Sequence, residues 1–228
     1  MIQDPNKIFN QDSPEIQNLI KEKKWRRFGE KNRILQIFNY VKNDIRFGFP
    51  KKALLSASQV VNEGRANAFN KSILLKTLLD ASGILCRFHA FTVKKEIYND
   101  IVPPLRFKLL PNHLISAWVE VFFDGQWIVI DGVQLDEKYF NNISKKFHEA
   151  QKEFVGYGCA LYLESGYQTD WDGKTHSYNQ RAAITRDHGV IEEFEWFFEE
   201  FAKDIKQLRK IRSKKTNLNI KKIRDPKK

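Results

Sequence analysis

Apolar residues recur at helical spacing through the first fifty positions. A first helix is predicted over residues 12–28, where Asp12 or Ser13 suits the N-cap and a proline follows at the first helical position. A second helix is predicted over residues 31–47, because its apolar residues lie three and four apart: Ile34, Ile37, Phe38, Val41 and Ile45. We therefore expect a helical N-terminal layer.

The most apolar helix is predicted to start directly after Asn67, which is its expected N-cap. Gly83 suits the position just beyond its C-terminus. Ser58 is expected to cap a shorter helix that ends near Gly64. Four leucines form the predicted buried stripe: Leu74, Leu75, Leu78 and Leu79. The stretch 85–93 then has the composition of a strand.

A β-hairpin is predicted around Asp124-Gly125, which is flanked by alternating apolar and polar residues and favours a type I′ turn. With Phe123 and Gln126 beside the turn, the register sets these facing pairs: Glu120 with Val129, Trp118 with Asp131, and Ser116 with Val133. Ser116 and Asp131 would then be diagonal neighbours on one face, roughly 7–8 Å apart.

The section from about residue 136 to 202 is less regular. Within it, residues 156–190 have the glycines, Asp and Tyr that are typical of a loop-rich cover over a core. Residues 191–215 predict a helix whose start is acidic and whose end is basic, as the helix dipole favours. The chain therefore combines helices and strands in an α+β arrangement.

Charge is concentrated at one end of the 228-residue chain. Residues 203–228 contain 12 Lys and Arg against 2 Asp and Glu, so 10 of the net 11 positive charges lie there. The nearly neutral body argues against an electrostatic nucleic-acid platform. Hydrophobic residues make up 42% of the chain, enough for a sizeable core, without a run long enough for an integral membrane segment. We expect a cytoplasmic protein without metal or other cofactors, since the two cysteines have no metal-ligand spacing.

The strings "SGILCRFHAF", "SAWVEVFFDGQW" and "WIVID" resemble the transglutaminase-like superfamily, relatives of papain-type cysteine proteases. The resemblance covers about residues 31–135. It implies a transglutaminase-like (papain-like) α+β core, in which a buried helix packs on an antiparallel sheet, with a helical N-terminal layer and a C-terminal helix. The implied domain spans residues 1–202, with its core at 31–135 and its cover at 136–202, followed by a basic helical end and tail at 203–228.

In that family a Cys at the start of the buried helix attacks an acyl carbon, a His takes its proton and an Asp orients the His. The Cys position, fifteen residues before Gly83, is Ala68 here, and the His position, two before Trp118, is Ser116. The Asp position is retained as Asp131. Alanine carries no nucleophile, and serine does not titrate near neutral pH, so neither residue supplies the missing chemistry.

Other residues offer only weak substitutes for the missing pair. His113 lies three residues from Ser116, hence on the opposite face of an unbroken strand. Cys86 is expected to be a small core residue, and Cys159 lies in a loop without an identifiable base beside it. Asp187 and His188 are either an orienting pair or chance neighbours.

Three further residues are candidates for binding at the same place. Asn67 would present a helix N-terminus that favours anions, and Trp118 would form a wall of the cleft in this fold. His89 either points into that cleft or satisfies a hydrogen bond beside it. Asp131 has a structural interpretation too, in which its carboxylate accepts from turn amides.

Two explanations of Ala68 are open: replacement of a cysteine nucleophile, or loss of the triad. A single replaced nucleophile does not explain Ser116, so the pair favours loss. The leading hypothesis is a catalytically impaired member that binds a peptide or acyl ligand in the cleft, or a protein partner. One alternative is a cysteine-dependent acyl transferase or amide hydrolase whose nucleophile has been replaced. The other alternative is a protein whose basic C-terminal tail binds an anionic partner, either nucleic acid or a membrane surface.

Overall fold

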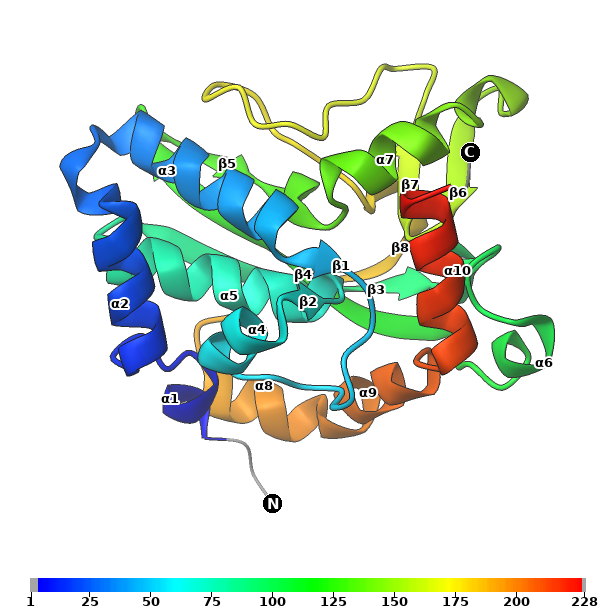
Figure 1. Cartoon of the computed structure of the whole chain (residues 1–228), viewed down its shortest axis with the longest axis horizontal. Coiled ribbons are helices and arrows are strands. Elements are labelled where there is room, and N and C mark those ends of the chain that lie inside the picture. The colour runs from blue at the N-terminus through cyan, green and yellow to red at the C-terminus, as the bar shows by residue number, and fades with distance from the viewer. Residues whose placement is uncertain (1–3, 227–228) are drawn as a thin grey trace.

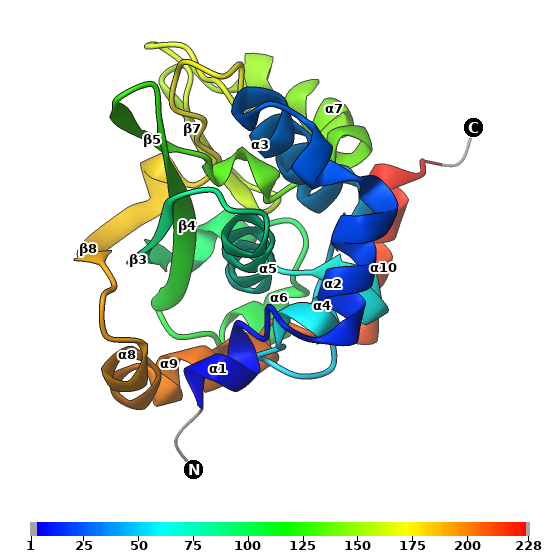
Figure 2. The ribbon, with the colours of Figure 1, turned by 90° about the vertical axis from the view of Figure 1, so that its left-hand side faces the viewer.

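The structure is a computed structural model that describes residues 4–226. Its central element is one buried helix, α5 (Ala68–Ala81). The helices are α1 (Pro5–Ile8), α2 (Pro14–Lys23), α3 (Glu30–Asn39), α4 (Ala57–Glu63), α5 (Ala68–Ala81), α6 (Pro104–Phe107), α7 (Glu137–Ser144), α8 (Phe194–Glu200), α9 (Ala202–Gln207) and α10 (Lys214–Arg224). The strands are β1 (Arg46–Phe47), β2 (Arg65–Ala66), β3 (Cys86–Lys94), β4 (His113–Phe123), β5 (Gln126–Val129), β6 (Glu153–Gly156), β7 (Cys159–Tyr162) and β8 (Ile184–Val190). Figures 1 and 2 show α5 in the middle, between the sheet on one side and α2, α4 and α10 on the other. The predicted α+β class is confirmed.

The N-terminal helices follow local capping signals. Ser13 caps α2, with its Oγ accepting from the Ile16 N–H at 3.4 Å. The predicted helix over 31–47 is shorter, because α3 passes into a π-helical turn at 40–44 and the chain then extends into β1, which pairs in parallel with β2. Ser56, rather than the predicted Ser58, caps α4, since its side chain and that of Gln59 form a reciprocal capping box.

Helix α5 is buried almost all around. Asn67 caps it as predicted, accepting from the Asn70 N–H at 3.0 Å, and Gly83 adopts the expected positive φ of 77° just past its end. The leucine stripe is buried as predicted, and polar residues on the other faces are buried too: Asn70, Lys71, Ser72 and Thr77. Each of these polar side chains has a hydrogen-bond partner, which is what allows a helix with polar groups to occupy the centre of a fold.

The main sheet has the strand order β5-β4-β3-β8 and is antiparallel throughout. Its β4–β5 hairpin turns at Asp124 and Gly125, whose φ values of 52° and 78° agree with the predicted type I′ turn. The predicted pair Glu120 with Val129 is confirmed.

The hairpin register does not extend as far as predicted. Strand β5 ends at Val129, and Asp131 opens a 3-10 turn whose backbone N–H donates to the Ser177 carbonyl at 3.0 Å. The predicted pairings of Trp118 with Asp131 and of Ser116 with Val133 are therefore wrong. The Ile130 N–H still donates to the Val119 carbonyl of β4 at 2.9 Å, and a parallel bridge joins Ile130 to Ser177 of the cover on the other edge. Pairing with β4 stops there, because the backbone turns into the 3-10 turn at 131–133.

The predicted helix over 191–215 is interrupted twice. Helices α8 and α9 meet at Phe201, and Ser213 then caps α10, which packs on α7 and buries Thr216, Ile220 and Arg224. The expected boundary after residue 202 falls inside α9, so the basic end is folded onto the body as far as residue 226 is described. None of the helices within residues 4–226 combines the length and apolar character that a membrane crossing requires.

Candidate functional site

The three positions that were predicted to correspond to a catalytic triad lie on separate elements and are all buried. Ala68 is the first residue of α5 and is 6% exposed. Ser116 lies on β4 and is 1% exposed, and Asp131, in the turn after β5, is fully buried. Within residues 4–226, the cavities beside α2, α7, α9, α10 and β7 are lined by other residues.

Asp131 accepts four N–H hydrogen bonds. Two come from backbone amides, Asn179 at 2.7 Å and Gln180 at 3.0 Å, and two from side-chain amides, Gln134 at 2.9 Å and Gln180 at 3.1 Å. Burial raises the pKa of Asp131 above its ordinary value, and these four bonds oppose that shift. None of the four donors is a histidine, so the carboxylate orients the cover segment and not an imidazole.

The side chain of Gln180 lies between the His and Asp positions. Its Oε1 accepts from the Ser116 hydroxyl at 2.8 Å, while its Nε2 donates to Asp131. A glutamine amide thus links the side chains at the predicted His and Asp positions. No sequence pattern pointed to Gln180, because "YNQRAA" has no motif and lies 64 positions from Ser116.

A second polar chain connects this network to the start of α5. The Gln134 side chain donates to Asp131 and to the Ser72 hydroxyl, which in turn donates to the Ala117 carbonyl at 2.7 Å. The Ser72 hydroxyl also lies 3.3 Å from the Ala68 carbonyl. The structure therefore brings the elements of the three predicted positions together through glutamine and serine side chains, none of which titrates near neutral pH.

Asn67 has a structural partner in the helix that it caps. Its Oδ1 accepts from both the backbone and the side chain of Asn70, each at 3.0 Å. Asn70 in turn accepts from the Leu55 N–H at 2.9 Å and donates to the Ala53 carbonyl at 3.0 Å. The start of α5 therefore anchors the loop that precedes α4.

His89 lies on the same sheet face as Trp118, but it belongs to an ionic cluster. Its Nδ1 is 2.8 Å from Glu120 and its Nε2 is 2.6 Å from Asp187, a residue of β8. Burial lowers the pKa of His89, but the two carboxylates outweigh it and raise the pKa overall. Trp118 packs 4.8 Å from the imidazole and donates its Nε1–H to Glu120 at 3.0 Å.

The pairing proposed between Asp187 and His188 is not formed as a hydrogen bond in the structure. Asp187 bonds to His89, and the His188 ring packs 4.7 Å from Phe201. His113 bonds to Thr185 at 3.1 Å. Each of these histidines is therefore engaged away from Asp131.

Neither cysteine has the environment of a nucleophile. Burial raises the pKa of the Cys86 thiol, which lies 3.1 Å from Asp80. Cys159 is fully buried, and burial raises its pKa as well. Both thiols are held in their protonated, poorly nucleophilic form.

A second buried cluster lies along α5, away from the triad positions. Lys71 is fully buried and donates to the carbonyls of Lys42 at 3.0 Å and Val133 at 2.9 Å, and burial lowers its pKa to about 7. The carboxylate of Asp136 is paired with Arg224 of α10 at 2.6 Å. No group of three or more His, Cys, Asp or Glu side chains with a metal-binding arrangement occurs in residues 4–226.

Comparison with known proteins gives a match to a solved structure and a match to a family model. No curated protein matches the chain. A solved structure, titled "The Crystal Structure of a Putative Cysteine Protease from Cytophaga hutchinsonii", matches with 15% identity and a TM-score of 0.44, covering 82% of this chain and 60% of that one. The chain thus spans less than two thirds of the length of that protein. The family model described as "Transglutaminase-like superfamily" matches residues 21–132, which run from α2 to the turn that holds Asp131. Residues 21–132 therefore form a core of the transglutaminase-like superfamily.

Proposed function

We propose that this protein is a catalytically impaired transglutaminase-like protein that acts by binding a partner protein. The observation that carries the proposal is the Gln180 amide, which joins Ser116 to Asp131. Together with Ala68 at the nucleophile position, it leaves the site without a group that attacks an acyl carbon and without a base that activates one.

Burial of the three positions favours a partner on the outer surface over an acyl or peptide ligand at the triad itself. Ala68, Ser116 and Asp131 are all buried, and the cover segment is bonded directly to Ser116 and Asp131. The thiols of Cys86 and Cys159 do not rescue the alternative of a cysteine-dependent enzyme, because both are buried with raised pKa values.

Stepwise restoration of the triad tests the proposal. Wild-type protein is expected to show no incorporation of a fluorescent amine into a glutamine-rich acceptor protein and no hydrolysis of an activated ester above background. Ala68→Cys alone is expected to stay inactive because it supplies a thiol without a base. Ala68→Cys combined with Ser116→His is expected to stay inactive as well, since the Gln180 side chain fills the path from residue 116 to Asp131.

The informative control is a further change of Gln180→Gly in the restored double variant. If the amide is the remaining obstacle, this variant is the one that gains activity, and circular dichroism confirms that each variant is folded. Turnover by the wild-type chain that disappears in Ser116→Ala or Asp131→Asn would overturn the proposal, because it would show that the unmodified site is catalytic.

A further inference from the structure

A groove of about 550 Å³ lies between the loop that precedes α4 and the α8–α9 arm, which Figure 1 shows side by side below α5. Its lining residues are Lys51, Lys52, Ala53, Leu54, Phe198, Ala202, Ile205, Lys206 and Arg209. We infer that this groove binds an acidic amphipathic segment of a partner protein. The inference rests on the partner-binding function proposed above and gives that function a place and a ligand chemistry.

The charges of the groove have one sign. Two lysines lie on the loop, Lys51 and Lys52, and two cations lie on the facing arm, Lys206 and Arg209, three residues apart and hence on one face of the helical chain. All four are exposed, and none of them is paired with a carboxylate within residues 4–226. The lining contains no Asp or Glu, although α8 is itself acidic. An acidic ligand would meet cations on both sides.

An apolar strip runs between these cations. Leu54 and Ala53 are half-buried and Ala202 is exposed, so apolar surface remains accessible along the floor. Beneath them Phe198 and Ile205 are buried. A helix with one apolar face and acidic flanks fits this arrangement, because its apolar face covers the strip while its carboxylates reach the cations on each side.

The groove is built on fixed supports. Phe198 packs against Phe197 at 5.5 Å and Phe9 at 6.1 Å, in an aromatic cluster under α8. The opposite side is held by Asn70 of α5, which bonds to the backbone on both sides of Leu54. A preformed groove loses little conformational entropy when a ligand binds.

The same features argue against nucleic acid and against a membrane. In sequence-independent binding of single-stranded nucleic acid, the bases stack on accessible aromatic rings. The one aromatic ring in the groove lining, Phe198, is only 1% exposed. A membrane surface would need apolar side chains that project outward. Here the apolar strip is recessed between the lysines of the loop and those of the arm.

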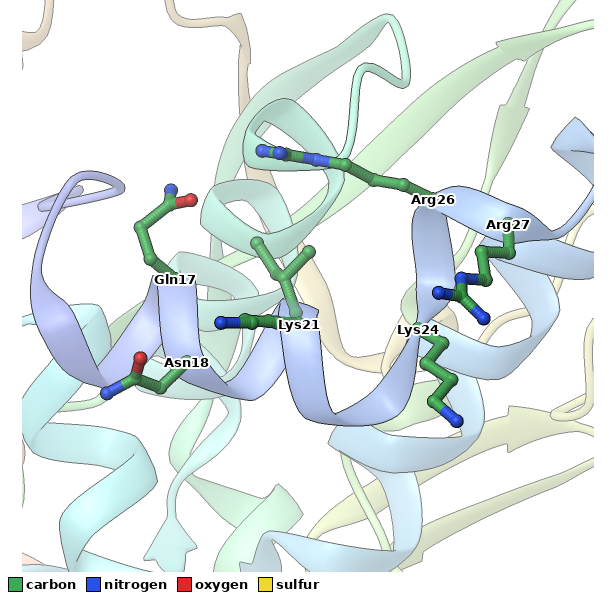
Figure 3. A pocket seen from close by; sticks show the side chains of 7 residues that line it. Gln17, Asn18, Lys21, Lys24, Arg26 and Arg27 are labelled. Atoms are coloured by element: carbon green, nitrogen blue, oxygen red, sulfur yellow. The ribbon is translucent and has the colours of Figure 1, made fainter.

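A second basic groove provides a matched control. It is formed by α2 and the turn after it, has a volume of about 500 Å³, and also contains four cations: Lys21, Lys24, Arg26 and Arg27. Figure 3 shows Lys21 near the amide side chains of Gln17 and Asn18, and Lys24 near Arg27. Its apolar lining is limited to Ile20, which is buried, and Arg26 donates to the Ala81 carbonyl at 2.7 Å. It therefore has comparable charge without the apolar strip.

The test uses fluorescence anisotropy with a labelled probe peptide of Leu and Glu at helical spacing. Its scrambled isomer, single-stranded DNA and phosphatidylserine vesicles serve as competing ligands. Wild-type protein is expected to bind the probe about tenfold more tightly than the scrambled isomer, because only the former presents one apolar face. Lys52→Glu with Lys206→Glu is expected to lower affinity at least about tenfold, and Leu54→Ser about threefold.

The matched reversal, Lys21→Glu with Lys24→Glu, is expected to change affinity less than about twofold. Equal losses from the two double variants, or equal binding of probe and scrambled isomer, would overturn the inference by showing that net charge alone attracts the peptide. Preference for DNA or vesicles over the probe would overturn it as well. These failures leave the triad assay untouched, while amine incorporation by the wild-type chain would overturn the proposed function without changing the peptide affinities.

Discussion

Replacing Arg224 with alanine tests whether the basic C-terminal segment is part of the fold. The Arg224 side chain donates to both oxygens of Asp136, at 2.9 and 2.6 Å, and to the Phe47 carbonyl at 2.8 Å. Both partners of the pair are buried, with side-chain exposures of 10% and 6%. The variant removes these bonds and leaves the Asp136 carboxylate buried beside two backbone N–H donors, Phe47 and Tyr139.

The expected loss in the free energy of unfolding is about 3–5 kcal/mol. Two charge-assisted hydrogen bonds contribute roughly 1.5–3 kcal/mol each, and water that enters the vacated space recovers part of that sum. This expected loss agrees with the roughly 3–5 kcal/mol by which proteins are destabilised when one partner of a buried ion pair is removed. The matched control is Lys222→Ala in the same helix, because Lys222 is exposed, and its expected cost is within about 0.5 kcal/mol.

Urea titration at neutral pH measures both variants, and an unchanged slope with denaturant shows that the folded and unfolded states are comparable. Burial raises the pKa of Asp136, but Arg224 outweighs it and holds the pKa below the ordinary value. A carboxyl group whose pKa is lowered by folding stabilises the protein at pH values above its ordinary pKa. That contribution is lost as the pH falls through the pKa of the folded state. The Arg224→Ala deficit should therefore shrink below about pH 4. An Arg224→Ala cost no larger than that of Lys222→Ala would refute the reasoning.

Three further substitutions probe other buried groups. Gln180→Leu should lower the free energy of unfolding by about 2–4 kcal/mol in urea titration, because it removes partners from Ser116 and Asp131 and places apolar atoms beside a carboxylate; a neutral result would show that the bridge is dispensable. His89→Gln should cost more stability at pH 5.5 than at pH 9. A histidine whose pKa is raised by folding stabilises the protein at pH values below its ordinary pKa, and this contribution is lost as the pH rises through the pKa of the folded state. An equal cost at both pH values would contradict that. Lys71→Met should flatten the pH dependence of the unfolding free energy between pH 7 and pH 10. In this range the wild type gains stability as the pH rises, because Lys71 is protonated in the unfolded chain and neutral in the folded protein. Identical pH profiles for wild type and variant would show that Lys71 does not titrate in this range.

Local signals account for the parts of the fold that the sequence predicted. The Asp124-Gly125 turn depends on two consecutive residues that tolerate positive φ, and both adopt it. The start of α5 depends on an Asn67 side chain that reaches the N–H three residues later. These interactions are complete within a few residues, so periodicity and capping rules are sufficient to find them.

The missed features all depend on residues far apart in the chain. Gln180 reaches Ser116 across 64 positions and Asp131 across 49, and Arg224 reaches Asp136 across 88. The hairpin prediction was wrong from Asp131 on for the same reason, because the chain turns there and the Asp131 N–H bonds to the carbonyl of Ser177, 46 positions away. The alternation of apolar and polar residues predicts how a strand pairs with its neighbour in sequence. It contains no information about a distant segment that also bonds to the chain.

The residues of the predicted site divide into those that have a structural role in the fold and those that have none. Asn67 still caps α5 and holds Asn70, which fixes the loop that forms one side of the basic groove. Asp131 still accepts four N–H bonds, and these attach the cover to the core whether or not a histidine is present. A nucleophilic thiol and a general base contribute nothing to such packing, so Ala68 and Ser116 can stand at their positions without cost to the fold. The cap and the carboxylate are therefore explained by stability alone, and their presence is no argument that the site is catalytic.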